Sequence, residues 1–246
     1  MHRTLKKALK YLSERSLAFL EFVYKRRTHY PSLSESDYLK RFGIEEIGGS
    51  YKVVNEQRLE KAYSKAWENR NYEIDKFWTR AAYFWGFIVL IFGCYISLLT
   101  SEHSQKALDM RLDLYLILLG FLFSLSWYLV ILGSKSWQKN WEAHIDRLEE
   151  YVSGPIYKTI YYSGKRFYSV SKLNEVMAMV VFGVWCGLFG RYVYTQFSFT
   201  INSKKIDFEA SISILLTFVF ASALRFGYCL GDYKSDKNEL FDRWDW

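Results

Sequence analysis

Four long apolar stretches constrain this chain more than any other feature of its sequence. They comprise residues 81–101, 114–134, 176–203 and 210–231. The first two contain no Asp, Glu, Lys, Arg or His, and the last two contain one such residue each, Arg191 and Arg225. A helix needs about 20 apolar residues to cross roughly 30 Å of hydrocarbon, and all four stretches reach that length. We therefore predict an all-α integral membrane protein with four transmembrane helices, helical cytoplasmic extensions and one small β-hairpin.

The orientation in the membrane follows from the Lys and Arg residues near the ends of these stretches. Fifteen lie on the side of the N-terminus, the central loop and the C-terminus, and five lie on the other side. Basic residues accumulate on the cytoplasmic side, so we predict a multi-pass protein of the bacterial inner (cytoplasmic) membrane with both termini in the cytoplasm. Basic loops beside anionic lipid also explain the formal net charge of +7 without a nucleic-acid partner.

The predicted organisation has five consecutive parts. They are a cytoplasmic helical region and stalk (1–80), the first two transmembrane helices (81–134), a cytoplasmic amphipathic helix and possible hairpin (135–173), the second two transmembrane helices (174–231) and a cytoplasmic tail (232–246). The stalk is expected to form one helix from about Val53 into the first stretch, because neither Pro nor Gly occurs before Gly86. Residues that favour strands flank Ser163-Gly164 and permit a hairpin there.

Two helical patterns precede the stalk. An amphipathic pattern begins near the N-terminus and must end before Pro31. A short helix is expected at 36–41, ending at Gly43, and Gly48-Gly49 marks a turn.

An apolar stripe follows the second stretch. Its members recur at i, i+4, i+8 and i+11, and they are Trp137, Trp141, Ile145 and Leu148. This spacing predicts one face of a helix that continues until Gly154-Pro155. On the cytoplasmic side the stripe would be a docking surface for a partner.

Two Gly-x-x-x-Gly pairs occur in the last two stretches. They are Gly183 with Gly187, and Gly227 with Gly231. Glycine allows helix backbones to approach closely in lipid, which predicts helix packing at both pairs. The packing could lie within one chain or between chains, and the pattern favours neither.

Arg225 lies about two helical turns from the cytoplasmic end of its stretch. An ionisable residue in the membrane points to a pore or a ligand site. The alternative is structural, since the long side chain can reach the headgroups or pair within the protein. Arg191, nearer the end of its stretch, is the second candidate for a pore or ligand.

Signatures of catalysis are sparse. Lys139-Asn-Trp-Glu-Ala-His144 resembles the Arg-Asn-x-x-x-His signature of HEPN ribonucleases, but Lys replaces the Arg that would grip phosphate with two hydrogen bonds. Phosphate-binding, dinucleotide-binding, zinc-protease and serine-hydrolase motifs are missing. The four histidines are scattered, and the three cysteines lie singly in apolar stretches. We therefore expect no enzymatic activity, no metal and no cofactor.

A resemblance to a known family starts at the end of the second stretch. Ser-Trp-Tyr-Leu-Val-Ile at 126–131 is similar to the SWYLLI segment of RipA-like octameric bacterial inner-membrane proteins. In that family a helix ending in I-x-x-[IL]-E follows, and Ile145-Asp-Arg-Leu-Glu149 stands at the matching distance. The chain departs from the basic SYRxLN segment, reading Ser134-Lys-Ser-Trp-Gln-Lys139, and it has two further apolar stretches. The resemblance implies a homo-oligomer with a cytoplasmic helical stalk.

Two functions remain under consideration, and a membrane-tethered HEPN-like ribonuclease that uses His144 is a less favoured third. The overall plan resembles small multi-span membrane effectors of bacterial anti-phage systems, which suggests an oligomer that forms or perturbs a pore. Its cytoplasmic region would then sense a protein or nucleotide trigger. The alternative is a non-enzymatic scaffold that recruits a cytoplasmic partner to the lipid bilayer.

Overall fold

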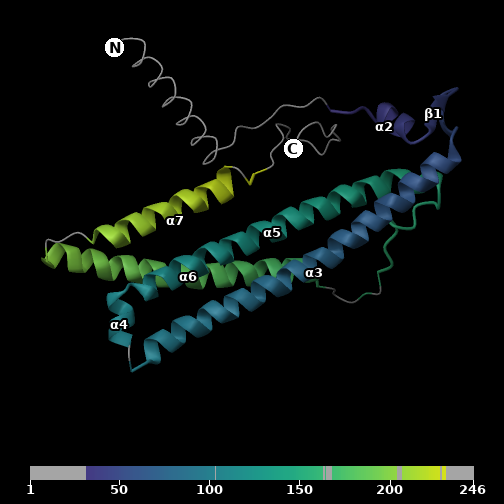
Figure 1. The fold of residues 1–246 in the computed structure, drawn as a ribbon. Coiled ribbons are helices and arrows are strands. Elements are labelled where there is room, and N and C mark those ends of the chain that lie inside the picture. The colour runs from purple at the N-terminus through teal and green to yellow at the C-terminus, as the bar shows by residue number, and fades with distance from the viewer. Residues whose placement is uncertain are drawn as a thin grey trace, which may run out of the picture. The chain divides into compact units, whose positions relative to one another are not determined.

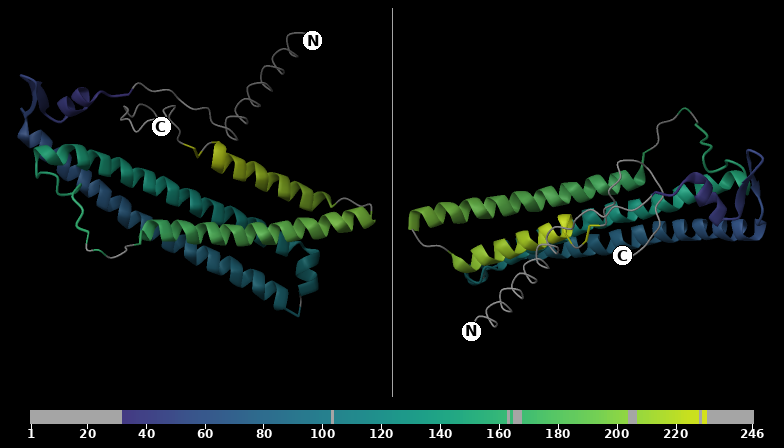
Figure 2. Two further views of the ribbon diagram at one scale, coloured as in Figure 1. Left: turned by 180° about the vertical axis from the view of Figure 1, so that it is seen from behind. Right: turned by 90° about the horizontal axis from the view of Figure 1, so that it is seen from above.

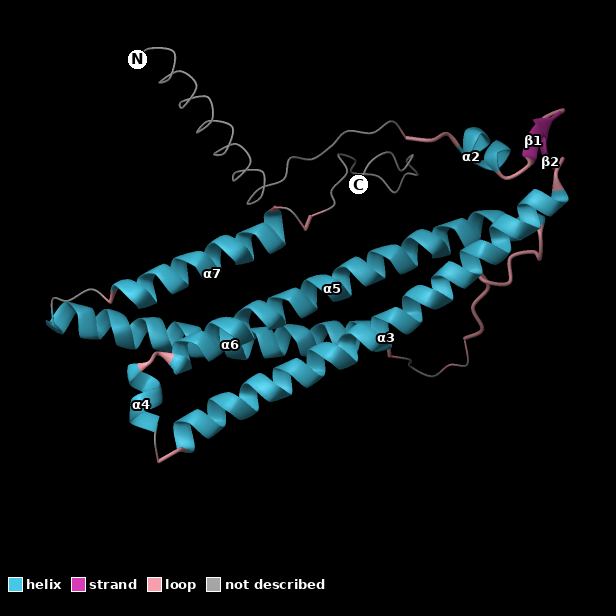
Figure 3. Ribbon diagram, viewed as in Figure 1, coloured by secondary structure: helices cyan, strands magenta, loops and turns pink. Residues whose placement is uncertain are grey.

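The computed structural model describes residues 32–102, 104–162, 164, 168–203, 207–227 and 229–230. Its helices are α2 (Glu35–Arg41), α3 (Glu56–Thr100), α4 (Ser104–Asp109), α5 (Leu112–Leu148), the 3-10 helix η1 (Glu149–Tyr151), α6 (Val170–Ser203) and α7 (Phe208–Phe226). The strands are β1 (Ile44–Ile47) and β2 (Ser50–Val53). Figure 1 labels these elements, and Figure 3 shows that helices dominate the described chain. The predicted all-α membrane fold with a small hairpin is confirmed. The helix predicted before Pro31, Gly231 and the tail lie outside the described residues.

Four of these helices are long and apolar enough to cross a membrane. The candidate segments are Glu56–Thr100, Leu112–Tyr151, Val170–Gln196 and Phe208–Phe226. The four predicted transmembrane helices are confirmed at this level. The 45 residues of α3 and the 37 residues of α5 far exceed the roughly 20 that cross a bilayer. Each of these two helices is therefore long enough to continue, as a more polar segment, beyond the part that crosses the bilayer.

The described chain forms two compact units. The membrane unit comprises 81–130 and 174–230, and the head unit comprises 32–80 and 131–173. Both α3 and α5 contribute to each unit, because the division falls within these helices. In the membrane unit α6 and α7 run in opposite directions, as do the contributing parts of α3 and α5 (Figure 2). The membrane unit is thus an antiparallel assembly of helices.

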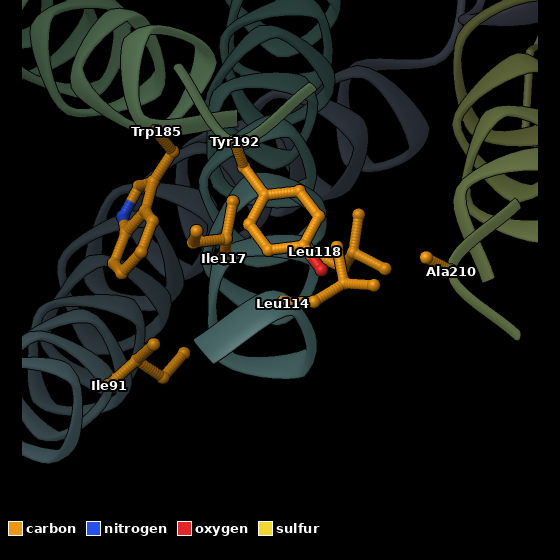
Figure 4. Close-up of a cluster of buried hydrophobic side chains, with 7 residues drawn as sticks. All are labelled: Ile91, Leu114, Ile117, Leu118, Trp185, Tyr192 and Ala210. Carbon is orange, nitrogen blue, oxygen red and sulfur yellow. The ribbon is translucent and has the colours of Figure 1, made fainter. Parts of the chain in front are cut away.

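All four long helices contribute to the core of the membrane unit. Its buried residues are Ile91, Leu114, Ile117, Leu118, Trp185, Tyr192 and Ala210 (Figure 4). In the most apolar part of α5, 39% of the residues are buried, against 11%, 22% and 17% in α3, α6 and α7. Helix α5 is therefore the one that the others pack against, and most of the surface of the other three faces outward.

The head unit has its own apolar core. Tyr38, Leu39, Ile44, Leu59 and Leu148 are each at most 2% exposed. Helix α2 begins at the N-cap Ser34, whose hydroxyl accepts a hydrogen bond from the Asp37 amide at 3.1 Å. This cap fixes the start of a seven-residue helix that could not persist alone, and burial of Tyr38 and Leu39 stabilises the rest.

The hairpin lies elsewhere than the sequence suggested. Strands β1 and β2 pair antiparallel from Ile44–Val53 to Ile47–Ser50, around Gly48 and Gly49. Both glycines have positive φ, 66° and 80°, as a two-residue hairpin turn requires. The described residues near Ser163-Gly164 contain no strand. Ser163 and residues 165–167 of the hairpin predicted there lie outside the described residues.

Candidate functional site

Helix α6 presents glycines on its outward face. Gly183, Gly187 and Gly190 recur at i, i+4 and i+7, and a Cβ built on any of them would have no atom within 4 Å. These glycines therefore do not pack against another helix of the described chain. In the second predicted pair, Gly227 is buried after α7 and its amide donates to the Ala223 carbonyl at 3.2 Å. Its partner Gly231 lies outside the described residues.

The opposite face of α6 is packed tightly. Trp185 is fully buried, and its ring stacks on Phe92 with centroids 4.4 Å apart. On the α5 side a Cβ at Gly120 would overlap the Trp185 indole, so only glycine fits there. Gly120 was not predicted from the sequence, although Gly120 and Ser124 form a small-x-x-x-small pair that indicates a close helix contact. The close helix contact within the chain is thus at Gly120, away from the Gly-x-x-x-Gly pairs.

The two arginines of the apolar stretches lie on different helices. Arg225 is exposed in the last turn of α7, with its guanidinium carbon 5.1 Å from the centre of the Phe226 ring. Arg191 is exposed in the second half of α6, about three turns before that helix ends at Ser203. Both side chains therefore stay candidates for a pore or ligand.

The predicted docking stripe divides into two halves. Ile145 is fully buried and Leu148 is 1% exposed, so both belong to the interior of the head unit. Trp137 and Trp141 are only half-buried, and their rings stack with centroids 6.4 Å apart. The interpretation of the stripe as a docking surface therefore does not extend to Ile145 and Leu148, while Trp137 and Trp141 stay candidates.

His144 connects α5 to α2. The Tyr38 hydroxyl lies 2.8 Å from the Nδ1 atom of His144, and the Trp141 ring is 5.7 Å away. Burial, with a smaller contribution from the Arg147 charge, lowers the pKa of His144. Burial also raises the pKa of Tyr38, although Arg147 opposes this. Both side chains are therefore neutral near pH 7, with Tyr38 donating and Nδ1 accepting.

Glu149, the last residue of the family-like Ile-x-x-Leu-Glu segment, holds the loop that follows α5. Its carboxylate is buried and accepts hydrogen bonds from the amides of Tyr157 at 2.7 Å and Lys158 at 3.2 Å. The Tyr157 ring then packs edge-on against Trp67 at 5.2 Å, and the Arg70 guanidinium lies 5.5 Å from that ring. A conspicuous sequence motif thus has a structural role here.

A polar cluster occupies the end of the membrane unit where α5 and α7 begin. Arg111 forms an ion pair with Asp207, and the Tyr115 hydroxyl donates to Glu209 at 2.7 Å. Asp207 is also the N-cap of α7, accepting from the Ala210 amide at 3.0 Å. Arg111 has φ 58°, an uncommon conformation for a residue with a side chain. These contacts tie the starts of two transmembrane helices together.

No group of three His, Cys, Asp or Glu side chains that could hold a metal occurs in the described parts of the chain. The three cysteines are not paired with one another, and the two exposed ones, Cys94 and Cys229, lie outside the packed core.

Comparison with known proteins gave one family match. The model of the octameric membrane protein family (8xMP) matches residues 60–194, more than half of the 246-residue chain. The matched region includes nearly all of α3, then α4, α5 and most of α6, but not α2, the hairpin or α7. The searches of curated proteins and of solved structures found no match.

Proposed function

The chain belongs to the octameric membrane protein family, and on this premise we propose that it is an oligomeric effector of the bacterial inner membrane. The oligomer forms or perturbs a pore, in anti-phage defence, when the head unit senses a protein or nucleotide. The observation that carries the proposal is the open glycine face of α6, at Gly183, Gly187 and Gly190.

This face fits a contact between copies. Lipid tails are as apolar as leucine, so helices associate in membranes by close packing and not by removal of apolar surface from water. The glycines leave a shallow strip on α6 that a helix of a second copy can approach closely. In a ring of identical subunits each copy offers this strip to one neighbour and a different face to the other.

The charge distribution supports a cytoplasmic head unit. Fifteen Lys and Arg residues flank the spans on the side of the head unit, against five on the other side. A cytoplasmic trigger would therefore meet the head unit first. Since α3 and α5 each contribute to both units, a change in the head can be passed on along two continuous helices.

Arg225 is a charged residue within an apolar stretch, as a pore or ligand site in the membrane would require. Its exposure on α7 leaves the guanidinium free to face a pore, a neighbouring subunit or the lipid headgroups. In a ring of copies the same position recurs in every subunit, so one arginine per chain becomes a ring of positive charge. Such a ring would favour anions in a pore.

Membrane potential in cells tests the proposal. Expression of the triggered wild-type protein should depolarise the membrane, and Arg225→Ala or Gly187→Leu should weaken the effect. Gly86→Leu is the matched control, because Gly86 on α3 also has no atom within 4 Å of a built Cβ. An intact membrane potential during full activity would contradict pore formation. Equal effects of Gly86→Leu and Gly187→Leu would contradict a specific role of the α6 glycines.

A non-enzymatic scaffold is the second candidate. It is favoured by Trp137 and Trp141, two stacked aromatic side chains that remain half-buried on α5. Large aromatic residues of this kind are enriched at protein interfaces. Capture of a cytoplasmic partner that survives Trp141→Ala would count against this function.

A ribonuclease activity is not part of the proposal. One of the two ring nitrogens of His144, Nδ1, accepts from Tyr38, and the ring is half-buried with the Tyr38 and Trp141 rings 5.6 and 5.7 Å away, which gives the residue a structural role. Ribonuclease activity that is present in the wild type and lost in His144→Ala would overturn this part of the account.

A further inference from the structure

The membrane unit contains buried oxygen atoms without partners. Asp113 Oδ1, the Tyr192 hydroxyl and Gln196 Oε1 are inaccessible to solvent and form no hydrogen bond in the described structure. Tyr192 itself is 7% exposed. Buried polar atoms are almost always paired, so an unpaired set needs an explanation.

These atoms come from helices that meet at one end of the unit. Figure 4 shows the Tyr192 ring extending from α6 toward Leu114 and Leu118 of α5, so its hydroxyl approaches the first turn of α5, which contains Asp113. Arg111, Asp113 and Asp207 are the charged side chains near this hydroxyl, and the Arg111 guanidinium approaches it without a well-aligned hydrogen bond. Gln196 follows Tyr192 by one helical turn and lies on the same face of α6.

The charges of this cluster do not cancel. Arg111 is neutralised by Asp207, with which it forms the ion pair. Glu209 accepts from Tyr115 at the exposed edge. Asp113 has no ion pair among the described residues, and its Oδ1 atom is inaccessible to solvent and has no hydrogen-bond partner there. Asp113 is half-buried, but an inaccessible carboxylate oxygen without a partner is still costly, and ionisable groups in membrane helices often mark ion sites.

We propose that Asp113 Oδ1, Gln196 Oε1 and the Tyr192 hydroxyl bind one monovalent alkali cation, with Na⁺ as the probe. Oxygen atoms are the ligands that hard cations take. One positive charge balances the one unpaired carboxylate. A divalent ion would leave an excess of charge, and the described residues offer no group of three acidic ligands for it. The site goes beyond the proposed function, because it neither requires nor excludes a pore.

Cation-dependent stability of the purified full chain in lipid nanodiscs tests this site. The melting temperature should rise saturably with NaCl relative to choline chloride at equal ionic strength. Equilibrium binding of radioactive sodium should saturate near one ion per chain. Asp113→Asn should abolish both effects, and Gln196→Met, which keeps the length but removes the oxygen, should weaken sodium binding about tenfold.

Asp109→Asn is the matched control. Asp109 is exposed at the end of α4, where it accepts from Gln105 at 3.0 Å, so its loss should leave sodium binding unchanged. Equal melting temperatures in sodium and choline would overturn the proposal, since they would mean that a proton or water satisfies Asp113. Sodium binding that persists in Asp113→Asn would overturn it too. If Asp113→Asn does not fold, wild-type binding and Gln196→Met decide the matter.

Discussion

Different interactions stabilise the interior of the membrane unit and the interior of the head unit. In the membrane unit a single large side chain, Trp185, fills the space that Gly120 leaves and stacks on Phe92. In the head unit polar contacts fix the loop and the small helix, through Glu149 and through the Tyr38–His144 hydrogen bond. Both units also bury apolar side chains.

The difference reflects the two solvents. Between helices in lipid the fit of the two surfaces matters most. Lipid tails are as apolar as the side chains, so moving apolar surface from lipid into a helix contact gains little free energy. In water, burial of apolar side chains supplies the main driving force, and a polar group that is buried with them must find a partner. We therefore expect the apolar helix contacts of the membrane unit to respond to changes in side-chain volume. The head unit, like the polar cluster around Arg111 and Asp207, should respond to changes in charge.

The largest effect is expected at Gly120. Gly120→Ala would place a methyl group inside the Trp185 indole, and overpacking of this kind costs about 1–3 kcal/mol. The melting temperature in detergent should fall, with the same loss at low and high salt. Gly133→Ala on the same helix is the control, because a Cβ there meets nothing within 4 Å. An equal response of the two variants would contradict the tight contact.

The next effect belongs to Glu149 in the head unit. Glu149→Gln keeps the shape but replaces a charged acceptor of two amide hydrogen bonds, which should cost about 1–3 kcal/mol. Amide hydrogen exchange should speed up at Tyr157 and Lys158. Exchange in the membrane unit should not change, and a uniform rise in both units would break the distinction.

A smaller effect is expected from acid. Because burial lowers the pKa of His144, the unfolded head unit takes up a proton near pH 6.5 that the folded unit resists. The stabilisation is complete above that pH and is lost as the pH falls toward the lower pKa of the folded state. The protection of the α2 amides, measured relative to their intrinsic exchange rates at each pH, should therefore fall below about pH 6.5.

The control for this pH dependence is His144→Gln, which keeps a hydrogen-bonding side chain but cannot titrate. It should flatten the response to pH at α2. Tyr38→Phe, which removes the hydrogen bond, should cost about 1 kcal/mol at neutral pH. A pH response that survives in His144→Gln would assign the titration to another group.

The smallest effect on the single chain is expected at Gly187. Its Cβ position is open, so Gly187→Leu should leave the free energy of unfolding of the separated subunit within about 0.5 kcal/mol of wild type. Unfolding in a detergent that dissociates the oligomer measures this. A large loss of stability there would mean that Gly187 packs within the chain after all.

Much of the fold followed from the sequence, for simple physical reasons. Long uncharged stretches can satisfy their backbone in lipid only as helices, so 81–101 and 114–134 left little choice. The missing Pro and Gly before Gly86 predicted the continuous α3. Ser34, Gly43 and Gly48-Gly49 carry local signals for the start of α2, its end and a turn.

The candidate sites were harder to predict, because their partners are far apart in the chain. Glu149 meets amides eight and nine residues later, Tyr38 meets His144 across 106 positions, and Arg111 meets Asp207. The helical spacing of the stripe predicted that Ile145 and Leu148 share one face. It carries no information about the packing of Leu148 against Tyr38 and Leu39 of α2. Gly-x-x-x-Gly patterns drew attention to Gly183 and Gly187, although the close contact within the chain is at Gly120.

The mass of the assembly in a native lipid environment tests the central claim most directly. Native mass spectrometry of the wild-type protein should give a homo-oligomer, with eight copies as the family predicts. Gly187→Leu should shift the distribution to smaller species, and Gly86→Leu should not. A monomeric wild-type protein, or an oligomer that Gly187→Leu leaves intact, would contradict the account of α6 as the contact between copies.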